Sequence, residues 1–135
     1  MSRTPPRLLI VEDNPADVLF LRHAFRDHDL SAAITVAKDG GQAIEYLERC
    51  SDDECPGLVI IDINLPKRDG IEVLRKCRFT PALAETKTLV LTSSDDPGDH
   101  LRAELIGVDA YIRKPRTLSG FADVVGAIRD LLRPI

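Results

Sequence analysis

No apolar segment of this sequence reaches the roughly 20 residues that a helix needs to cross a bilayer. Residues 1–7 also contain no apolar core of the kind that a secretory signal peptide carries. These two absences argue against a membrane-spanning or exported protein. We therefore expect the chain to work in the cytoplasm, without a membrane as its partner.

Cysteine is scarce as well, with only Cys50, Cys55 and Cys77 in the chain. Three cysteines without paired C-x-x-C elements exclude a four-cysteine zinc site. A disulfide framework is not expected either, and Cys77 fits the apolar side of a helix. The sequence thus predicts buried, reduced thiols.

Positive charge is not in excess, because 18 Lys and Arg residues stand against 22 Asp and Glu residues, for a formal net charge of -4. Nucleic-acid recognition depends on clustered Lys and Arg, so we expect no nucleic-acid partner. With 135 residues, 44% of them hydrophobic, the chain has the size of one globular domain. We assign residues 1–135 to that domain, with a short N-terminal arm at residues 1–6.

Continuous apolar runs alternate with amphipathic stretches along the chain. Residues 58–61, Leu-Val-Ile-Ile, are apolar at every position, which is typical of a strand buried on both faces of a parallel sheet. A helix over 15–27 begins at the Asn-Pro pair 14–15, and an apolar stripe from Leu118 to Leu132 predicts the last helix. The alternation indicates βαβ units and an α/β fold with a doubly wound parallel sheet. Five strands are predicted, at residues 8–11, 33–37, 58–61, 88–92 and 110–113, with five helices.

Polar side chains follow four of these strands at the point where each strand ends. Glu12 and Asp13 follow the first strand, Asp62 the third, Thr92 the fourth and Lys114 the fifth. Since parallel strands end at one edge of a sheet, these side chains are expected to meet there. Converging carboxylates repel one another unless a cation intervenes, and Mg²⁺ prefers oxygen ligands.

A magnesium site beside a lysine and a hydroxyl suits phosphoryl chemistry. The metal and Lys114 would neutralise the charge of a transferred phosphoryl group, and Thr92 would donate a hydrogen bond. Asp62 is the candidate nucleophile, because carboxylates can accept phosphoryl groups as mixed anhydrides.

These residues at these spacings resemble the receiver domain of two-component response regulators. The resemblance implies the flavodoxin-like fold with strand order 2-1-3-4-5, which the chemotaxis receivers exemplify. Within the family, the sequence most resembles stand-alone regulators that pair with bacterial phytochrome histidine kinases. The supporting motifs lie at residues 11–17, 64–67, 69–70 and 91–95.

The resemblance also implies a role for each residue at the metal site. Asp62 would accept the phosphoryl group from a phosphohistidine of a sensor histidine kinase. Asp13 and Asp62 would coordinate Mg²⁺ directly, Glu12 through a water molecule, and Asn64 through its backbone carbonyl. Apart from its own phosphorylation and dephosphorylation, such a protein catalyses no reaction.

A second set of roles concerns switching. Lys114 would pair with the phosphoryl group, and in the family it precedes a cis proline, here Pro115. Thr92 and Tyr111 match the pair of switch residues, in which the hydroxyl moves toward the phosphoryl group and the aromatic ring turns inward. The output face would comprise the fourth helix, the fifth strand and the last helix, which often form a homodimer interface. The chain has no room for an output domain, so the expected output is a protein contact.

Three other functions compete with this interpretation. An interaction module that works without phosphorylation is opposed by the intact acids, hydroxyl and lysine. An aspartate-nucleophile phosphatase needs a second acid two residues after the nucleophile, where this chain has Asn64. A dinucleotide-binding domain needs a glycine-rich loop after the first strand, where residues 12–15 read Glu-Asp-Asn-Pro.

Overall fold

The computed structural model describes residues 4–51, 53–65 and 69–133. Residues 66 and 67 of one predicted motif and the first half of the N-terminal arm lie outside these ranges. The described part contains one five-stranded parallel sheet in the order β2-β1-β3-β4-β5. The predicted doubly wound, flavodoxin-like fold is therefore confirmed. The elements are β1 (Arg7–Val11), α1 (Pro15–Asp27), β2 (Ala33–Ala37), α2 (Gly40–Arg49), β3 (Leu58–Ile61), α3 (Gly70–Phe79), a 3-10 helix (Pro81–Leu83), β4 (Lys87–Thr92), α4 (Pro97–Ile106), β5 (Ala110–Arg113) and α5 (Phe121–Leu132).

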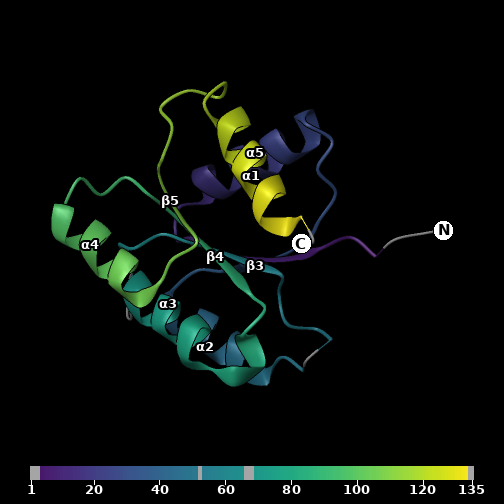
Figure 1. The fold of residues 1–135 in the computed structure, drawn as a ribbon. Coiled ribbons are helices and arrows are strands. Elements are labelled where there is room, and N and C mark those ends of the chain that lie inside the picture. Colours follow the sequence, from purple (N-terminus) through teal and green to yellow (C-terminus); the bar gives the residue numbers. More distant parts are fainter. Residues whose placement is uncertain (1–3, 52, 66–68, 134–135) are drawn as a thin grey trace.

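Helices cover both faces of the sheet. Figure 1 shows α1 and α5 side by side on one face and α2, α3 and α4 on the other. Successive residues of a strand point to opposite faces, and β1 follows this rule: Leu8 and Ile10 pack under α1 and α5, whereas Leu9 and Val11 pack under α2 and α3. The sheet is thus buried on both sides, as the continuous apolar runs predict. None of the helices in the described ranges is long and apolar enough to cross a membrane.

The strand β3 lies at the centre of the molecule, between β1 and β4. Its residues Leu58–Ile61 are all buried, with at most 2% of any residue exposed. Val11 pairs with Ile61 in the register of β1 and β3, so both strands end at the same level. The residues that follow them, Glu12 and Asp62, are consequently neighbours at one edge of the sheet.

Side-chain caps fix where the helices begin. Asn14, Asp39, Asp69 and Asp96 each accept a hydrogen bond from a backbone N–H group in the first turn of α1, α2, α3 and α4, respectively. Such caps satisfy donors that the helix itself leaves free. At the other end of α4, Gly107 adopts a left-handed conformation with φ of 108°, which glycine accepts readily at the end of a helix. Most helix boundaries are therefore determined by local sequence.

The last helix is shorter than its apolar stripe predicts. It begins at Phe121, and Leu118 lies before it with 56% of its surface exposed. The N–H of Gly120 donates to the side chain and to the carbonyl of Thr117, which forms a turn at 117–120. This turn removes Leu118 from the helical face.

The prediction of reduced thiols at Cys50 and Cys55 is wrong, because these two residues form a disulfide. Cys50 ends α2, and the N–H groups of Glu54 and Cys55 both donate to the carbonyl of Ser51. This turn brings the Cα atoms of the two cysteines to 5.0 Å, a separation that a disulfide can bridge. Cys77 is a buried free thiol, as predicted, and burial raises its pKa to about 12.

Gly70 allows α3 to approach the end of β3 closely. A Cβ atom at this position would lie 2.3 Å from the carbonyl oxygen of Asp62 and 2.8 Å from Ile61 Cγ2 and from Ile63 Cα. The N–H of Gly70 also donates to the carbonyl of Ile63 at 2.9 Å. The absence of a side chain here helps to set the position of the Asp62 backbone.

We expect Gly70→Ala to lower the free energy of unfolding by about 1–3 kcal/mol, because the new methyl group meets backbone atoms that cannot move away cheaply. Gly126→Ala is the matched control, since a Cβ atom at Gly126 in α5 meets nothing within 4 Å. That substitution should stabilise the protein by about 0.5–1 kcal/mol through the higher helix propensity of alanine. Urea unfolding measures both, and equal stability of the two variants would contradict the role of Gly70.

Candidate functional site

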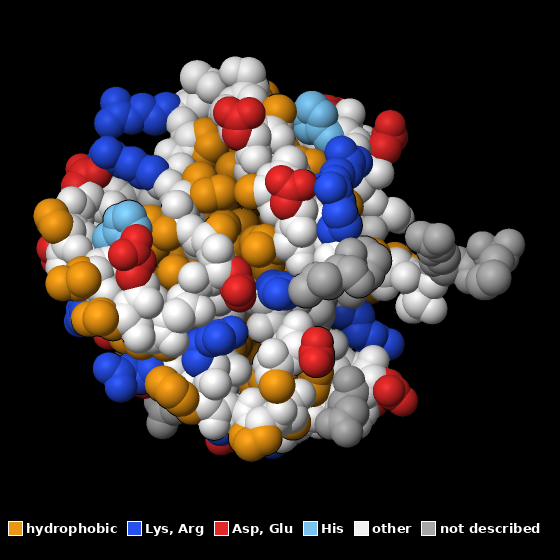
Figure 2. Space-filling model, viewed as in Figure 1, with side chains coloured by type: hydrophobic (Ala, Val, Ile, Leu, Met, Phe, Trp, Pro, Cys, Tyr) orange, Lys and Arg blue, Asp and Glu red, His pale blue; other side chains and the backbone are white. Residues whose placement is uncertain are grey.

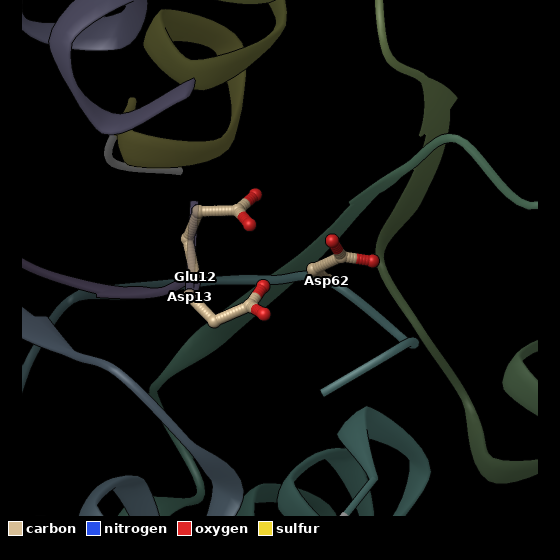
Figure 3. A group of neighbouring side chains, drawn as sticks. All are labelled: Glu12, Asp13 and Asp62. Carbon is tan, nitrogen blue, oxygen red and sulfur yellow. The ribbon is translucent and has the colours of Figure 1, made fainter. Parts of the chain in front are cut away.

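The site lies at the carboxyl ends of β1, β3, β4 and β5. The N–H of Asp62 donates to the carbonyl of Val11 at 3.1 Å, and the N–H of Glu12 donates to the carbonyl of Ala37 at 3.0 Å. The sheet ladder therefore continues one residue past β1 and β3 and holds the backbone of both acids. Figure 3 shows the side chains of Glu12 and Asp13 extending from the end of β1 on the side where Asp62 leaves β3.

The three acids form one cluster. Glu12, Asp13 and Asp62 each offer a carboxylate oxygen, and these atoms lie within 4.8 Å of one another. Glu12 and Asp62 are buried, whereas Asp13 is exposed. Carboxylates at such distances repel one another, and a divalent cation would relieve the repulsion. The cluster could therefore bind a divalent metal ion.

Glu12 has an unusually high pKa, mainly because it is buried. Burial raises the pKa of Glu12, a hydrogen bond from Lys114 lowers it, the charge of Asp62 raises it and a hydrogen bond from the N–H of Asn14 lowers it, and the resulting pKa is about 7. Near neutral pH, the metal-free protein thus keeps a proton on Glu12 in about half of the molecules. A cation in the cluster would displace that proton.

Lys114 neutralises part of the cluster. Its Nζ lies 2.8 Å from Glu12 Oε1, 2.7 Å from Asp17 Oδ2 and 2.9 Å from Asp62 Oδ2. An ammonium group has three N–H donors, so these three carboxylates match its capacity. Although burial lowers the pKa of Lys114, hydrogen bonds to Asp17, Glu12 and Asp62 raise it above its usual value. Lys114 therefore stays charged at any physiological pH.

The pairing of β4 with β5 positions Lys114. Its backbone N–H donates to the carbonyl of Thr92 at 2.9 Å, which continues the pairing of β4 with β5 past Arg113. The prediction of a cis peptide bond before Pro115 is wrong, because the Lys114–Pro115 bond is trans. A trans bond is the intrinsic preference before proline, and with it the Lys114 side chain reaches all three acids.

Thr92 and Asn64 bind the other oxygen of Asp62. The hydroxyl of Thr92, which is fully buried, donates to Asp62 Oδ1 at 2.8 Å, and the backbone N–H of Asn64 donates to the same atom at 3.1 Å. Together with Lys114 on Oδ2, these donors fix the orientation of the Asp62 carboxylate. The predicted role of the Asn64 carbonyl as a metal ligand stays a prediction.

Tyr111 lies farther along the same edge and does not bind the acids. Its ring stacks on His100 of α4, with a centroid separation of 4.2 Å and an interplanar angle of 13°. Its hydroxyl is buried without a hydrogen-bond partner in the described part of the chain. Burial and then the charges of Asp99, Asp96 and Asp62 raise the pKa of Tyr111. The hydroxyl is thus shielded from solvent, and its role in switching stays a prediction.

Two residues of the site were not predicted from the sequence. Asp17 binds Lys114, and Gly70 packs against Asp62. A signal for Asp17 existed, because α1 begins next to Asp13 and its first turn must lie at the same edge of the sheet. For Gly70, no signal in the sequence distinguishes close packing from an ordinary helix start.

The geometry and the comparisons with known proteins agree. A sequence model of the response regulator receiver domain matches residues 8–125. The chain therefore belongs to the response regulator receiver family of two-component signalling.

Particular relatives narrow this assignment. Response regulator Rcp1 of Synechocystis sp. is 30% identical over 132 residues, which cover 96% of this chain and 90% of that protein. Its Mn²⁺-bound structure superposes with a TM-score of 0.83 at 29% identity, covering 97% of each chain. The phosphorylated cyanobacterial phytochrome response regulator RcpA gives a TM-score of 0.85 at 29% identity, covering 96% of this chain and 94% of its own. The bacteriophytochrome response regulator AtBRR gives a TM-score of 0.75 at 32% identity, covering 96% of this chain and 94% of its own. The predicted resemblance to phytochrome-associated regulators is thus confirmed.

Divalent-cation binding should depend on pH through Glu12. Below pH 7 a proton on Glu12 competes with the cation, and above pH 7 the carboxylate is free, so affinity rises with pH. Between pH 6 and pH 8 we expect affinity to increase about tenfold for one competing proton with a pKa near 7. Isothermal titration with Mn²⁺ measures this change.

Two variants test whether Glu12 carries the proton that competes with the cation. Glu12→Gln should bind more weakly and lose most of the pH dependence, whereas Glu45→Gln, which alters an exposed acid of α2, should keep it. A pH dependence that survives in Glu12→Gln would show that another group carries the proton.

Proposed function

We propose that this protein is a response regulator that accepts a phosphoryl group on Asp62 from a sensor histidine kinase, with Mg²⁺ as cofactor. The observation that carries the proposal is the environment of the Asp62 carboxylate. Thr92 and Asn64 bind one of its oxygens, Lys114 binds the other, and Glu12 and Asp13 lie beside it. A buried carboxylate among these groups is oriented for attack on phosphorus.

The proposed reaction transfers one phosphoryl group. An oxygen of Asp62 forms a bond to phosphorus while the bond from phosphorus to the histidine nitrogen of the kinase breaks, and the electron pair of that bond remains on the imidazole. The product is an acyl phosphate on Asp62, and no proton has to leave the attacking carboxylate. Lys114 balances negative charge on the phosphoryl oxygens, and the Thr92 hydroxyl donates a hydrogen bond to one of them.

The residues that would hold Mg²⁺ are Asp13 and Asp62 directly, Glu12 through water, and the backbone carbonyl of Asn64. Their support is chemical and geometric, since oxygen ligands with retained water suit Mg²⁺, and carboxylate oxygens of Glu12, Asp13 and Asp62 lie within 4.8 Å of one another. When bound, the ion would neutralise charge on the phosphoryl group.

A chain of hydrogen bonds links Asp62 to α4 and supports a switch at Thr92. Ser94 N–H donates to Thr92 Oγ1 at 3.2 Å, and Ser94 Oγ donates to Asp99 Oδ2 in α4 at 2.6 Å. A new charge on Asp62 would draw the Thr92 hydroxyl toward it and thus disturb Ser94. Tyr111, whose ring rests on His100 of the same helix, is the second member of the proposed switch.

The proposed partner is a bacteriophytochrome histidine kinase in the cytoplasm. Support comes from Rcp1, RcpA and AtBRR, since the latter two are described as phytochrome and bacteriophytochrome response regulators. A cavity of about 460 Å³ opens beside Glu12 and Asp13, and α1 contributes Val18 and Leu19 to its wall. Its position offers the kinase an apolar surface next to the acids.

The proposed output is a protein contact, and one form of it is a homodimer through α4, β5 and α5. Leu101 and Leu105, one turn apart on α4, are 57% and 77% exposed. Figure 2 shows hydrophobic side chains gathered over α4 at the left of the view. Exposed apolar side chains at helical spacing are typical of a surface that another protein covers. Nucleic acid is not among the proposed partners.

Phosphorylation is tested by intact-protein mass spectrometry after incubation with Mg²⁺ and acetyl phosphate. The wild type should gain one phosphoryl group, and Asp62→Asn or addition of a chelator should abolish the gain. Asp27→Asn, which changes an exposed acid of α1, should react like the wild type. If the wild type gains no mass and also binds no Mg²⁺, the phosphorylation proposal fails and an interaction module remains.

Dimerisation is tested by sedimentation with and without the phosphoryl donor. Replacing both Leu101 and Leu105 with Glu should weaken self-association at least tenfold, since burying a charge in an apolar interface is unfavourable. Phe79→Glu is the control, because Phe79 is 70% exposed at the end of α3 and outside the proposed interface. Equal effects of the two changes would place the interface elsewhere.

A further inference from the structure

Asp17 is the partner that lies nearest to the Lys114 ammonium group. It is the third residue of α1, and its Oδ2 lies 2.7 Å from Lys114 Nζ, compared with 2.8 Å for Glu12 and 2.9 Å for Asp62. The contact joins residues 97 positions apart in the chain. It therefore connects the first turn of α1 to the end of β5.

Asp17 differs from the other two acids on Lys114 in one respect. Glu12 and Asp62 belong to the cluster that could hold a metal ion, together with Asp13, whereas Asp17 is not in that group. A bound cation would share the carboxylates of Glu12 and Asp62 with Lys114. Asp17 would remain as the one carboxylate of the three that interacts with Lys114 alone.

A bound cation would also repel Lys114. A divalent ion and an ammonium group that share two carboxylates are like charges a few ångströms apart, and this repulsion favours movement of the lysine out of the site. The carboxylate of Asp17, which contacts the ammonium group, attracts it and opposes that movement. The Asp17 side chain is 22% exposed, so solvent weakens this attraction only in part.

We propose that Asp17 is a positioning residue that holds the Lys114 ammonium group beside Asp62 while a divalent cation occupies the acid cluster. This inference rests on the proposed phosphorylation of Asp62. With Asp17 in place, the ammonium group stays beside Asp62, and the N–H that donates to Asp62 Oδ2 can pass to an oxygen of the incoming phosphoryl group. Without it, the ammonium group moves toward solvent when the metal binds, and transfer slows.

A simpler role for Asp17 is to stabilise the start of α1, since acids favour the first turn of a helix. Asp123 provides the matched control for that effect. It is also the third residue of its helix, α5, and it is exposed. Asp17→Asn and Asp123→Asn thus remove the same charge from the same helical position, and only the first removes a contact to Lys114.

The first measurement is the rate of phosphorylation by acetyl phosphate at saturating Mg²⁺. We expect Asp17→Asn to react about tenfold more slowly than the wild type, as for loss of one charge-assisted hydrogen bond in the transition state. Asp123→Asn should react at the wild-type rate, and Asp17→Glu, which keeps the charge, should recover most of it. If Asp17→Asn reacts as fast as Asp123→Asn, or if both are equally slow, the inference is overturned.

The second measurement is the ¹⁵N signal of the Lys114 ammonium group, which is visible only while its protons are held in hydrogen bonds. In the wild type the signal should persist when Mg²⁺ is added, and in Asp17→Asn it should disappear on addition of Mg²⁺. Loss of the signal in the Mg²⁺-loaded wild type would overturn the inference without use of any variant. A wild type that is not phosphorylated at all would instead overturn the proposed function on which the inference rests.

Discussion

The structure depends on the compensation of negative charge at one edge of the sheet. Glu12, Asp17 and Asp62 converge on a single ammonium group, and Asp13 lies beside them without contact to it. One lysine cannot neutralise this many carboxylates, and burial together with the charge of Asp62 raises the pKa of Glu12. A further cation at this site would relieve repulsion between the carboxylates. A surplus of negative charge, rather than a preformed cage, is what makes this edge receptive to a metal ion.

Such a concentration of charge is possible because the fold supplies the free energy elsewhere. The strands β1 and β3 are buried on both faces, and burial of their hydrophobic residues offsets the repulsion between Glu12 and Asp62. The ladder hydrogen bonds of Glu12 and Asp62 hold the backbone rigidly, and Gly70 lets α3 close over the end of β3. The acids consequently have little freedom to separate, which preserves the repulsion that a cation relieves.

The fold was predictable because its signals are local. Apolar runs defined the five strands within about one residue, and Asn14 before proline marked the start of α1. The features that the sequence did not predict depend on the relative placement of segments and on the geometry of a loop. The Cys50–Cys55 disulfide needs the hydrogen bonds from Glu54 and Cys55 to Ser51, and the contact of Asp17 with Lys114 needs the rotation of α1 relative to β5. Composition and periodicity of the sequence determine neither the turn nor the rotation of the helix. The cis bond expected before Pro115 followed from the family resemblance, whereas the Lys114–Pro115 dipeptide by itself favours the observed trans bond.

The energetics of switching follow from the same charge balance. Converting a mostly inactive population into a mostly active one takes about 5.5 kcal/mol of differential stabilisation. A hydrogen bond to a charged group contributes about 1.5–3 kcal/mol, so movement of the Thr92 hydroxyl alone is insufficient. In the proposed switch Lys114 would contribute too, because it contacts Asp62 directly and is tied to α1 through Asp17. The proposed signal would then leave Asp62 by two routes, one through Thr92 and Ser94 to α4, and one through Lys114 to the first turn of α1.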